Sequence, residues 1–284
     1  MKIMVTGAKG QLGRDVMIQL ATTGHQYQGV DQDDFDLTDQ AAVFDYVNNY
    51  RPEIVIHCAA YTAVDKAETE KERCYAVNVN GTAYLAQACQ TINAKLLYIS
   101  SDYVFDGSGD TPFEIDSQPA PINYYGLTKY QGELEVQKHL DRFFIVRASW
   151  IFGNHGHNFV KTILNLAKKQ PEIRVVNDQV GSPTYAYDLA KLILDLVVTD
   201  KYGIYHVTNE GFCSWYQFAT EIINLSGCPT KIIPITSQDY PTPAVRPKNS
   251  RLSKNSLIQA GFSLLPHYRD ALTRYLKQEV SKNS

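Results

Sequence analysis

The sequence lacks the charge and the long apolar runs that would direct it to nucleic acid or to a membrane. Its 27 lysines and arginines nearly balance its 30 aspartates and glutamates, and the formal net charge is -3. So small a charge gives no general attraction to phosphate backbones or to anionic lipids. No segment approaches the roughly 18 uninterrupted apolar residues that a membrane-spanning helix needs. We therefore expect the protein to bind neither nucleic acid nor a membrane.

Cysteine is scarce, and its spacing suggests no pairing. The five cysteines are odd in number, lie in apolar segments and show no Cys-x-x-Cys spacing. The chain opens MKIMVTG, which is already strand-like by its third residue and leaves no room for a secretion signal before folded structure. We therefore expect a cytoplasmic protein whose reduced cysteines have packing roles.

Apolar, strand-like runs alternate with amphipathic stretches in the first half of the chain. The runs cover residues 3–7, 25–31, 53–60, 95–101 and 143–149. This alternation is typical of parallel strands joined by helices. Right-handed crossovers then build a doubly wound sheet that binds ligands at the carboxyl ends of its strands. The sequence therefore predicts an α/β protein with a Rossmann-type doubly wound parallel sheet and a smaller C-terminal α/β lobe for the substrate.

Length and pattern favour two closely joined domains. Residues 1–150 are the predicted dinucleotide-binding domain, and residues 151–284 are mainly the substrate-binding lobe. Segments near 173–208 are expected to return to the large sheet or to flank it, so the two domains interleave. A predicted helix from Trp215 to Ser226 and the proline-rich loop at 241–247 belong to the smaller lobe.

A glycine-rich loop follows the first strand. The string GAKGQLG places Gly7, Gly10 and Gly13 between that strand and the first helix. Glycines at these points allow a tight turn, a close approach of the backbone to a pyrophosphate and close helix–sheet packing, and the helix N-terminus supplies N–H groups. The spacing alone is weak evidence, but its place directly after the first strand predicts a dinucleotide site.

Two charged residues bear on the choice of dinucleotide. Asp31 ends the second strand, where a carboxylate usually binds the adenosine ribose hydroxyls and disfavours a 2′-phosphate. Lys9, inside the loop, is a candidate partner for that phosphate. The local charges thus leave the choice between NADPH and NADH open.

A serine and a Tyr–Lys pair are the candidate catalytic groups. The fourth strand ends in YISSDYVFDG, which places Ser101 at the carboxyl edge of the sheet, and INYYGLTKYQ follows at 122–131. In a helix Tyr125 and Lys129 share a face, whereas Tyr124 points about 100° away. A nearby lysine, together with an oxidised nicotinamide, would lower the tyrosine pKa, and the Ser101 hydroxyl would hold the reacting oxygen. Tyr125 is therefore the predicted proton donor.

The order of glycine loop, strand-end serine and Tyr-x-x-x-Lys resembles the extended branch of the short-chain dehydrogenase/reductase superfamily, which acts on nucleotide sugars. Further segments resemble the dTDP-4-dehydrorhamnose reductase family. They are AAYTAVDKAE (59–68), SSDYVFDG, YGLTK, RASWIFG (147–153), VNDQVGSPT (176–184) and YPTPAVRPKNSRL (240–252). The last two strings are much more specific than the glycine loop, and the set extends over the whole chain.

The resemblance implies reduction of the C4 ketone of dTDP-4-dehydro-L-rhamnose, with Ser101, Tyr125 and Lys129 as the catalytic residues. NADPH is favoured over NADH because the implied reaction is a biosynthetic reduction. Together with the loop residues, the resemblance places cofactor contacts at Gly7, Lys9, Gly10, Gln11, Leu12, Gly13, Asp31, Asp36, Leu37, Ala59, Ala60, Tyr61, Thr62, Tyr125 and Lys129. It places substrate contacts at Val64, Ser101, Tyr103, Trp150, Asn158, Asn177 and Arg246.

Two positions depart from the family pattern. Many relatives carry Thr where Ser101 stands, and a common Asn at the end of the third strand is His57 here. Serine keeps the hydroxyl, and His57 is interpreted as a structural histidine. The functions left open are another nucleotide-sugar 4-ketoreductase, an epimerase, and a non-catalytic regulatory subunit of the methionine adenosyltransferase type. A dehydratase is disfavoured, because Asp102 and Tyr103 follow Ser101 where that class typically has Asp-Glu.

Metal ions and partner chains are weakly indicated. His155 and His157 stand two apart in a glycine-bearing loop, which suits solvated side chains better than zinc ligands. Some relatives pair through acidic surfaces with a divalent ion, so the resemblance raises the hypothesis of a homodimer. The one other partner expected is a small-molecule nucleotide sugar.

Overall fold

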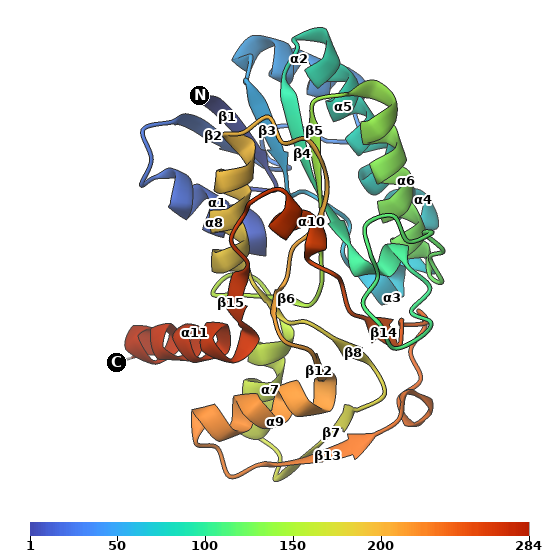
Figure 1. Cartoon of the computed structure of the whole chain (residues 1–284), viewed down its shortest axis with the longest axis vertical. Helices are drawn as coiled ribbons and strands as arrows, with labels where there is room; N and C mark the ends of the chain where they lie inside the picture. Colours follow the sequence, from blue (N-terminus) through green and yellow to red (C-terminus); the bar gives the residue numbers. More distant parts are fainter. Residues whose placement is uncertain (284) are drawn as a thin grey trace.

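The larger part of the molecule is built on one parallel sheet (Figure 1). This computed structural model describes residues 1–283, with side chains up to residue 278. The sheet has the order β10-β5-β4-β3-β1-β2, and every neighbouring pair in it is parallel. Its strands are β1 (Lys2–Thr6), β2 (Gln26–Val30), β3 (Ile54–His57), β4 (Lys95–Ser101), β5 (Phe143–Ala148) and β10 (Gly203–His206). The five predicted strands and their parallel arrangement are confirmed.

Helices cover both faces of this sheet. On one side lie α1 (Gln11–Leu20) and α8 (Ala186–Val197), and on the other lie α2 (Gln40–Tyr50), α5 (Thr82–Thr91) and α6 (Tyr124–His139). Side chains alternate between the two faces along a strand. Accordingly Ile3 and Val5 pack with α1 and α8, while Met4 between them packs with α2 and α5. Burial on both faces explains why these strands are almost wholly apolar.

Short elements connect the strand ends on the side of the sheet that carries α6. They are α3 (Val64–Ala67), α4 (Lys71–Tyr75), a π-helical segment (Ala76–Gly81) and a 3₁₀ turn (Asp102–Val104). A second 3₁₀ turn (Ser237–Asp239) and α10 (Asn255–Gln259) occur later in the chain.

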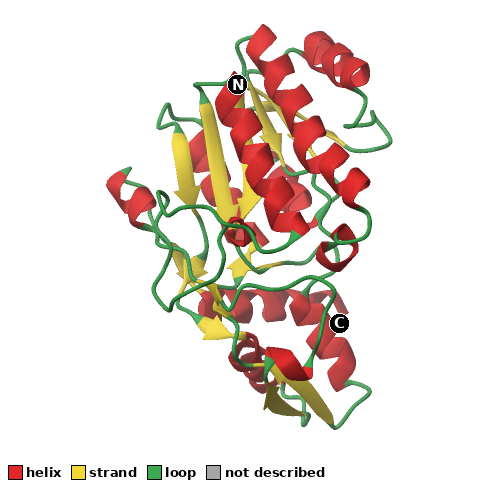
Figure 2. Ribbon diagram, turned by 90° about the vertical axis from the view of Figure 1, so that its right-hand side faces the viewer, coloured by secondary structure: helices red, strands yellow, loops and turns green. Residues whose placement is uncertain are grey.

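The smaller lobe lies below the sheet in the views of Figures 1 and 2. Its strands are short: β6 (Ile151–Phe152), β7 (Glu172–Val176), β8 (Val180–Gly181), β9 (Thr184–Tyr185), β11 (Asn209–Glu210), β12 (Cys213–Ser214), β13 (Lys231–Ile235), β14 (Asn249–Ser250) and β15 (Leu265–His267). Its helices are α7 (Phe159–Ala167), α9 (Trp215–Ser226) and α11 (Tyr268–Asn283). Buried aromatic rings dominate its core, among them Phe152, Tyr185, Phe218 and Tyr275. The predicted helix from Trp215 to Ser226 is confirmed.

The segments near 173–208 take different positions. β10 joins the large sheet beside β5, and α8 packs on α1. β7, at the start of this stretch, pairs with β13 in a separate two-stranded sheet and does not join the large sheet. Only alternate residues of β7, Ile173 and Val175, are buried, and such a strand suits a sheet with one solvated face rather than the middle of a covered parallel sheet. The division of the chain near residue 150 stays a prediction.

Among the helices of residues 1–283, none combines the length and the apolar character that crossing a membrane requires.

Candidate active site

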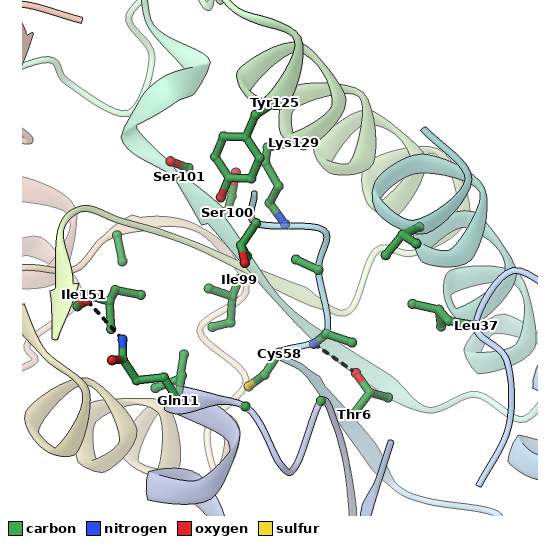
Figure 3. Close-up of a pocket in the computed structure, with 18 of the residues that line it drawn as sticks. Thr6, Gln11, Leu37, Cys58, Ile99, Ser100, Ser101, Tyr125, Lys129 and Ile151 are labelled. Carbon is green, nitrogen blue, oxygen red and sulfur yellow. Dashed lines mark hydrogen bonds between the residues drawn. The ribbon is translucent and has the colours of Figure 1, made fainter. Parts of the chain in front are cut away.

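A cavity of about 770 Å³ lies at the carboxyl ends of the parallel strands (Figure 3). It lies at the point where the strand order reverses, because β1 has β2 on one side and β3 on the other. Open α/β sheets bind their ligands at this switch point. The glycine loop, the ends of β3 and β4, and α6 form part of its wall, and Trp150, Ile151, His157 and Trp215 add residues that follow β5.

The glycine loop has the shape that a pyrophosphate requires. Gly7 has a φ of 67°, and a Cβ on it would lie 2.6 Å from the backbone nitrogen of Ala59. A Cβ on Gly13 would lie 2.1 Å from the Gly7 oxygen, so Gly13 serves the packing of α1 on the loop. Gly10 stands at the N-cap of α1 and has no side chain to cap it. The first N–H groups of α1 therefore suit the oxygens of an anion.

The part of the cavity beside Asp31 carries a local charge network. The Asp31 carboxylate accepts the backbone N–H groups of Lys9 and Gln32, both at 2.9 Å. The Lys9 ammonium pairs with Asp33, which sequence reasoning did not single out. Their hydrogen bond, and then their charges, raise the pKa of Lys9 and lower that of Asp33. The Asp33 carboxylate thus counteracts the positive charge of Lys9, which would otherwise favour a 2′-phosphate.

The start of α6 packs closely against the strand end that carries Ser101. Asn123 caps the helix by accepting the Gly126 N–H at 2.8 Å, and its amide group donates to the Val245 carbonyl at 2.9 Å. Gly126 has no room for a side chain, because a Cβ would lie 2.1 Å from the backbone oxygen of Tyr103. This close approach brings Tyr125 to Ser101.

The two neighbouring tyrosines lie in different surroundings, as the helix register predicts. Tyr125 and Lys129 line the cavity and project from α6 toward the end of β4 (Figure 3). Tyr124 is not among the residues that line it. Its backbone N–H donates to Glu68 at 2.8 Å, and the Lys71 ammonium lies 5.3 Å from the centroid of its ring. Of these two neighbours, Tyr125 is therefore the one that faces the cavity.

Burial sets the protonation states of the Tyr–Lys pair. Burial, and then the charge of Asp102, raise the pKa of Tyr125, while a hydrogen bond with Ser101 acts in the opposite direction. Burial lowers the pKa of Lys129 to about 7, against the charge of Glu133, which raises it. The lowering of the tyrosine pKa that we expected from the lysine is not produced by the protein's own groups. Tyr125 consequently carries its proton at neutral pH.

Ser101 is held by its neighbours. Its hydroxyl donates to Asp102 Oδ1 at 2.9 Å and accepts the Tyr103 N–H at 3.1 Å. Asp102 is buried, and burial raises its pKa to about 6. The Ser101 hydroxyl must therefore rotate away from Asp102 before it can donate to a ligand.

A buried ion pair joins α6, β4 and β5 beneath these residues. Glu133 and Arg147 have side chains only 0% and 2% exposed, and they form two hydrogen bonds of 2.7 and 2.9 Å. Ser100, next to Ser101, donates to the same carboxylate. A bidentate arginine–carboxylate pair has a fixed geometry, so this network holds the strand end and the catalytic helix in one register.

Most of the predicted contacts line the cavity. They are Gly7, Lys9, Gly10, Gln11, Leu12, Asp31, Asp36, Leu37, Ala59, Ala60, Thr62, Val64, Ser101, Tyr103, Tyr125, Lys129 and Trp150.

Five predicted contacts are not among the lining residues and have structural partners instead. Gly13 packs against the loop, and Tyr61 donates its hydroxyl to Glu70. Asn158 caps α7 and donates to the Gln11 side chain at 2.9 Å. Asn177 accepts the Ser214 hydroxyl at 2.7 Å. Arg246 forms a two-point ion pair with Asp65.

The cavity also contains residues that sequence reasoning missed. They are Thr6, Val30, Gln32, Phe35, Cys58, Val77, Ile99, Ser100, Asp102, Ala148, Ile151, His157 and Trp215. Most of them adjoin a predicted strand end or loop, and that position was the available signal. Trp215 has no such signal, because it belongs to a helix far along the chain.

His57 lies among structural partners. His57 is buried between the hydroxyls of Thr6, at 2.7 Å, and Thr82, at 3.2 Å, and burial lowers its pKa to about 3. Its interpretation as a structural histidine is confirmed. Within the part of the chain that the structure describes, no three His, Cys, Asp or Glu side chains gather as metal ligands.

Fold and site together define a class of protein. A doubly wound parallel sheet, a glycine loop after its first strand, and a serine, tyrosine and lysine at one cavity are the features of a Rossmann-type short-chain dehydrogenase/reductase. Within this class, the chain belongs to the family described as RmlD substrate binding domain, which matches residues 1–281.

Three relatives show how closely the whole chain follows this family. The chain is 40% identical to the spore coat polysaccharide biosynthesis protein SpsK of Bacillus subtilis, over 99% of this chain and 98% of the relative. It is 39% identical to a dTDP-4-dehydrorhamnose reductase of Aggregatibacter actinomycetemcomitans, over 93% and 94%. The crystal structure of dTDP-4-dehydrorhamnose reductase from Bacillus anthracis in complex with NADP is 41% identical, with a TM-score of 0.96 over 98% of this chain and 99% of that one.

Proposed function

We propose that the protein reduces the C4 ketone of dTDP-4-dehydro-L-rhamnose to dTDP-L-rhamnose, with NADPH as the preferred cofactor and NADH as an alternative. It is an NAD(P)H-dependent reductase of its family, and relatives similar over nearly their whole length carry this activity in their names. The observation that carries the proposal is the single cavity that contains the glycine loop together with Ser101, Tyr125 and Lys129.

The residues present fit a dinucleotide. The N-terminus of α1 and the backbone of Gly7 and Gly10 would hold the pyrophosphate. Asp31 and Lys9 would flank the adenosine ribose, and Lys129 would bond the ribose at the nicotinamide end. When bound, the reduced nicotinamide supplies the hydride.

The protein's own part in the reaction is proton transfer and positioning. Tyr125 donates its proton to the C4 oxygen as negative charge develops there, which is general acid catalysis. The Ser101 hydroxyl rotates from Asp102 to that oxygen and orients it. With the dinucleotide bound, Lys129 and the nicotinamide together would stabilise the phenolate that Tyr125 becomes. The buried pair of Glu133 and Arg147 keeps these groups in register.

A turnover assay tests the proposal. Purified protein is mixed with dTDP-4-dehydro-L-rhamnose and either NADPH or NADH, the loss of reduced cofactor is followed by absorbance, and the product is identified by NMR. We expect cofactor loss that depends on the sugar and forms the 4-hydroxy product. Cofactor binding without turnover, combined with a changed activity of a methionine adenosyltransferase, would favour the regulatory alternative.

Other outcomes of the assay would identify the remaining alternatives. Turnover of a different 4-keto epimer at a higher rate would indicate another nucleotide-sugar ketoreductase. Interconversion of C4 epimers without net use of cofactor would indicate an epimerase. Elimination from dTDP-glucose is not expected, because Tyr103 stands where a dehydratase has a second carboxylate. The homodimer and the cytoplasmic location stay predictions.

A further inference from the structure

The two tryptophans of the chain stack on each other at the cavity. Trp150 follows the end of β5, and Trp215 begins α9 in the smaller lobe. Their ring centroids are 3.6 Å apart and their planes differ by 13°. Both residues line the cavity that contains Ser101 and Tyr125. One stack therefore joins the carboxyl edge of the large sheet to the smaller lobe.

Trp150 has an unfavourable backbone conformation. Its φ is 50°, in the left-handed region that is unfavourable for a non-glycine residue. Such a conformation persists where the surroundings impose it, and it is found at functional sites. The Trp150 carbonyl accepts the Thr184 N–H at 3.1 Å. The Trp150 ring packs closely on Gly181, because a Cβ added to that glycine would lie 2.9 Å from Trp150 Cε2.

Trp215 is itself rigidly placed. It directly follows Ser214, which caps α9 in a reciprocal pair of hydrogen bonds with Gln217. The Ser214 hydroxyl donates to Asn177 at 2.7 Å. On the other side, the Trp215 ring contacts Phe159 with centroids 4.5 Å apart. Trp215 can thus act as a fixed support for Trp150.

The stack lies close to the reacting groups. Ala148, two residues before Trp150, is the register partner of Ser101 across β4 and β5. The stacked rings therefore add a rigid apolar surface near the wall that carries the serine and the tyrosine. A sugar ring presents C–H faces that pack on such a surface, whereas the dinucleotide has its own wall along the glycine loop.

We propose that Trp215 is a positioning residue, which holds Trp150 in its left-handed conformation and so maintains the wall against which the nucleotide sugar lies. This inference deepens the proposed function and rests on it. Asn177 belongs to the same support, because it accepts the hydroxyl of the residue that caps α9, although it does not itself line the cavity.

Kinetics of three variants test this inference. Trp215→Leu removes the stack, Trp215→Phe keeps an aromatic ring, and Phe212→Leu removes an exposed ring of the same lobe that is not among the residues lining the cavity. For Trp215→Leu we expect the KM for the 4-keto sugar to rise about three- to tenfold, the range that an aromatic contact is worth. The Kd for NADPH should stay within about twofold of wild type, which a general loss of structure would not allow. Trp215→Phe should recover most of the loss, and Phe212→Leu should match wild type.

Fluorescence gives a second measurement. Because Trp150 and Trp215 are the only tryptophans of the sequence, emission excited at the red edge of protein absorption, where the 19 tyrosines hardly absorb, reports on this stack. Titration with dTDP-L-rhamnose should change the emission saturably in wild type and in Phe212→Leu. Measurements of NADPH affinity and thermal melting identify a variant that is unfolded. If Trp215→Leu is unfolded, the sugar KM of Trp215→Phe tests the inference in its place.

The result that overturns the inference is an active wild type with an unchanged sugar KM in Trp215→Leu, or an equal loss of sugar and NADPH affinity in a folded variant. Failure of the proposed function looks different. In that case wild type itself does not turn over the 4-keto sugar.

Discussion

Tyr125 lies on the cavity wall with a phenol whose pKa burial raises, so it carries a proton that it can donate at neutral pH. Tyr125→Phe keeps the ring and its edge-on contact with Tyr103 at 5.8 Å, but removes that proton. We expect turnover to fall by roughly 10² to 10⁴, which is about 3 to 5 kcal/mol of barrier. NADPH binding, measured by fluorescence titration, should survive.

Two further variants separate chemistry from packing at the same helix start. Tyr124→Phe should keep turnover within about an order of magnitude of wild type, since its hydroxyl can lose one hydrogen bond at most. Lys129→Ala should impair both turnover and NADPH affinity. An inactive Tyr124→Phe beside an active Tyr125→Phe would contradict the assigned roles.

The choice of dinucleotide is also decided by single residues. Asp33 pairs with Lys9, and the Asp31 carboxylate accepts the Lys9 backbone N–H. Asp33→Asn should release the lysine for a 2′-phosphate. The ratio of kcat/KM for NADPH to that for NADH should then rise about two- to fivefold, because an exposed ion pair is a weak interaction. Asp31→Ala should move the ratio in the same direction.

Lys9→Ala is the matched control for the dinucleotide prediction. It should lower the ratio that Asp33→Asn raises. If the ratio is the same in Lys9→Ala and in wild type, Lys9 does not face the 2′ position.

At the scale of elements, the proline-rich loop is tied to two helices of the larger part of the molecule. Arg246 pairs with Asp65 on α3, and the Val245 carbonyl accepts the amide of Asn123 at the start of α6. The loop therefore reaches the helix that carries Tyr125 and Lys129. Loosening the loop should affect catalysis as well as stability.

The ion pair between Asp65 and Arg246 gives a pH-dependent prediction. The hydrogen bond from Arg246 lowers the pKa of Asp65 below its ordinary value, against a smaller effect of burial. The stability from this pair is therefore present above about pH 4, where the carboxyl is ionised in the unfolded chain, and is lost as the pH falls through the folded pKa. At pH 7 Asp65→Asn should lower the Tm by about 1–3 °C, because both side chains are partly exposed and solvent screens them.

Melting curves between pH 3 and pH 7 measure this effect. The difference between wild type and Asp65→Asn should shrink as the pH falls below about 4. A difference that stays constant over this range would show that the substitution acts through packing rather than through charge.

For the whole molecule, the cavity couples ligand binding to stability, because its wall combines the large sheet with residues of the smaller lobe. NADPH at a hundred times its Kd should stabilise the folded protein by about 2.7 kcal/mol and raise the Tm by roughly 5 °C. Gly10→Val should abolish this shift. Gly10 has a φ of -71°, which any residue adopts, but a Cβ there would lie 3.0 Å from the Gly7 backbone oxygen, so the valine crowds the loop as well as obstructing a pyrophosphate.

The comparison for Gly10→Val is its own melting temperature without NADPH. That temperature should fall modestly because of the close contact with the Gly7 oxygen, so the quantity compared is the NADPH-induced shift of each protein. A variant that keeps the full NADPH shift would show that the pyrophosphate does not approach Gly10.

Features that depend on neighbouring residues could be predicted from the sequence. Strand periodicity predicted the parallel sheet, and the spacing of Tyr125 and Lys129 predicted a shared helix face. The glycine string predicted the turn at Gly7, where the positive φ and the close backbone of Ala59 leave no room for a side chain. These signals can be read from the sequence because each is set by backbone geometry within one element.

Contacts between groups that are distant in the sequence became known only from the fold. It stacked Trp215 on Trp150, placed the Glu133–Arg147 pair beneath the catalytic helix and paired β7 with β13 outside the large sheet. The fold also pairs Lys9 with Asp33, and burial raises the pKa of Tyr125. Such contacts depend on how whole elements pack and on how much water they exclude, and neither quantity is encoded in the spacing of residues along one segment.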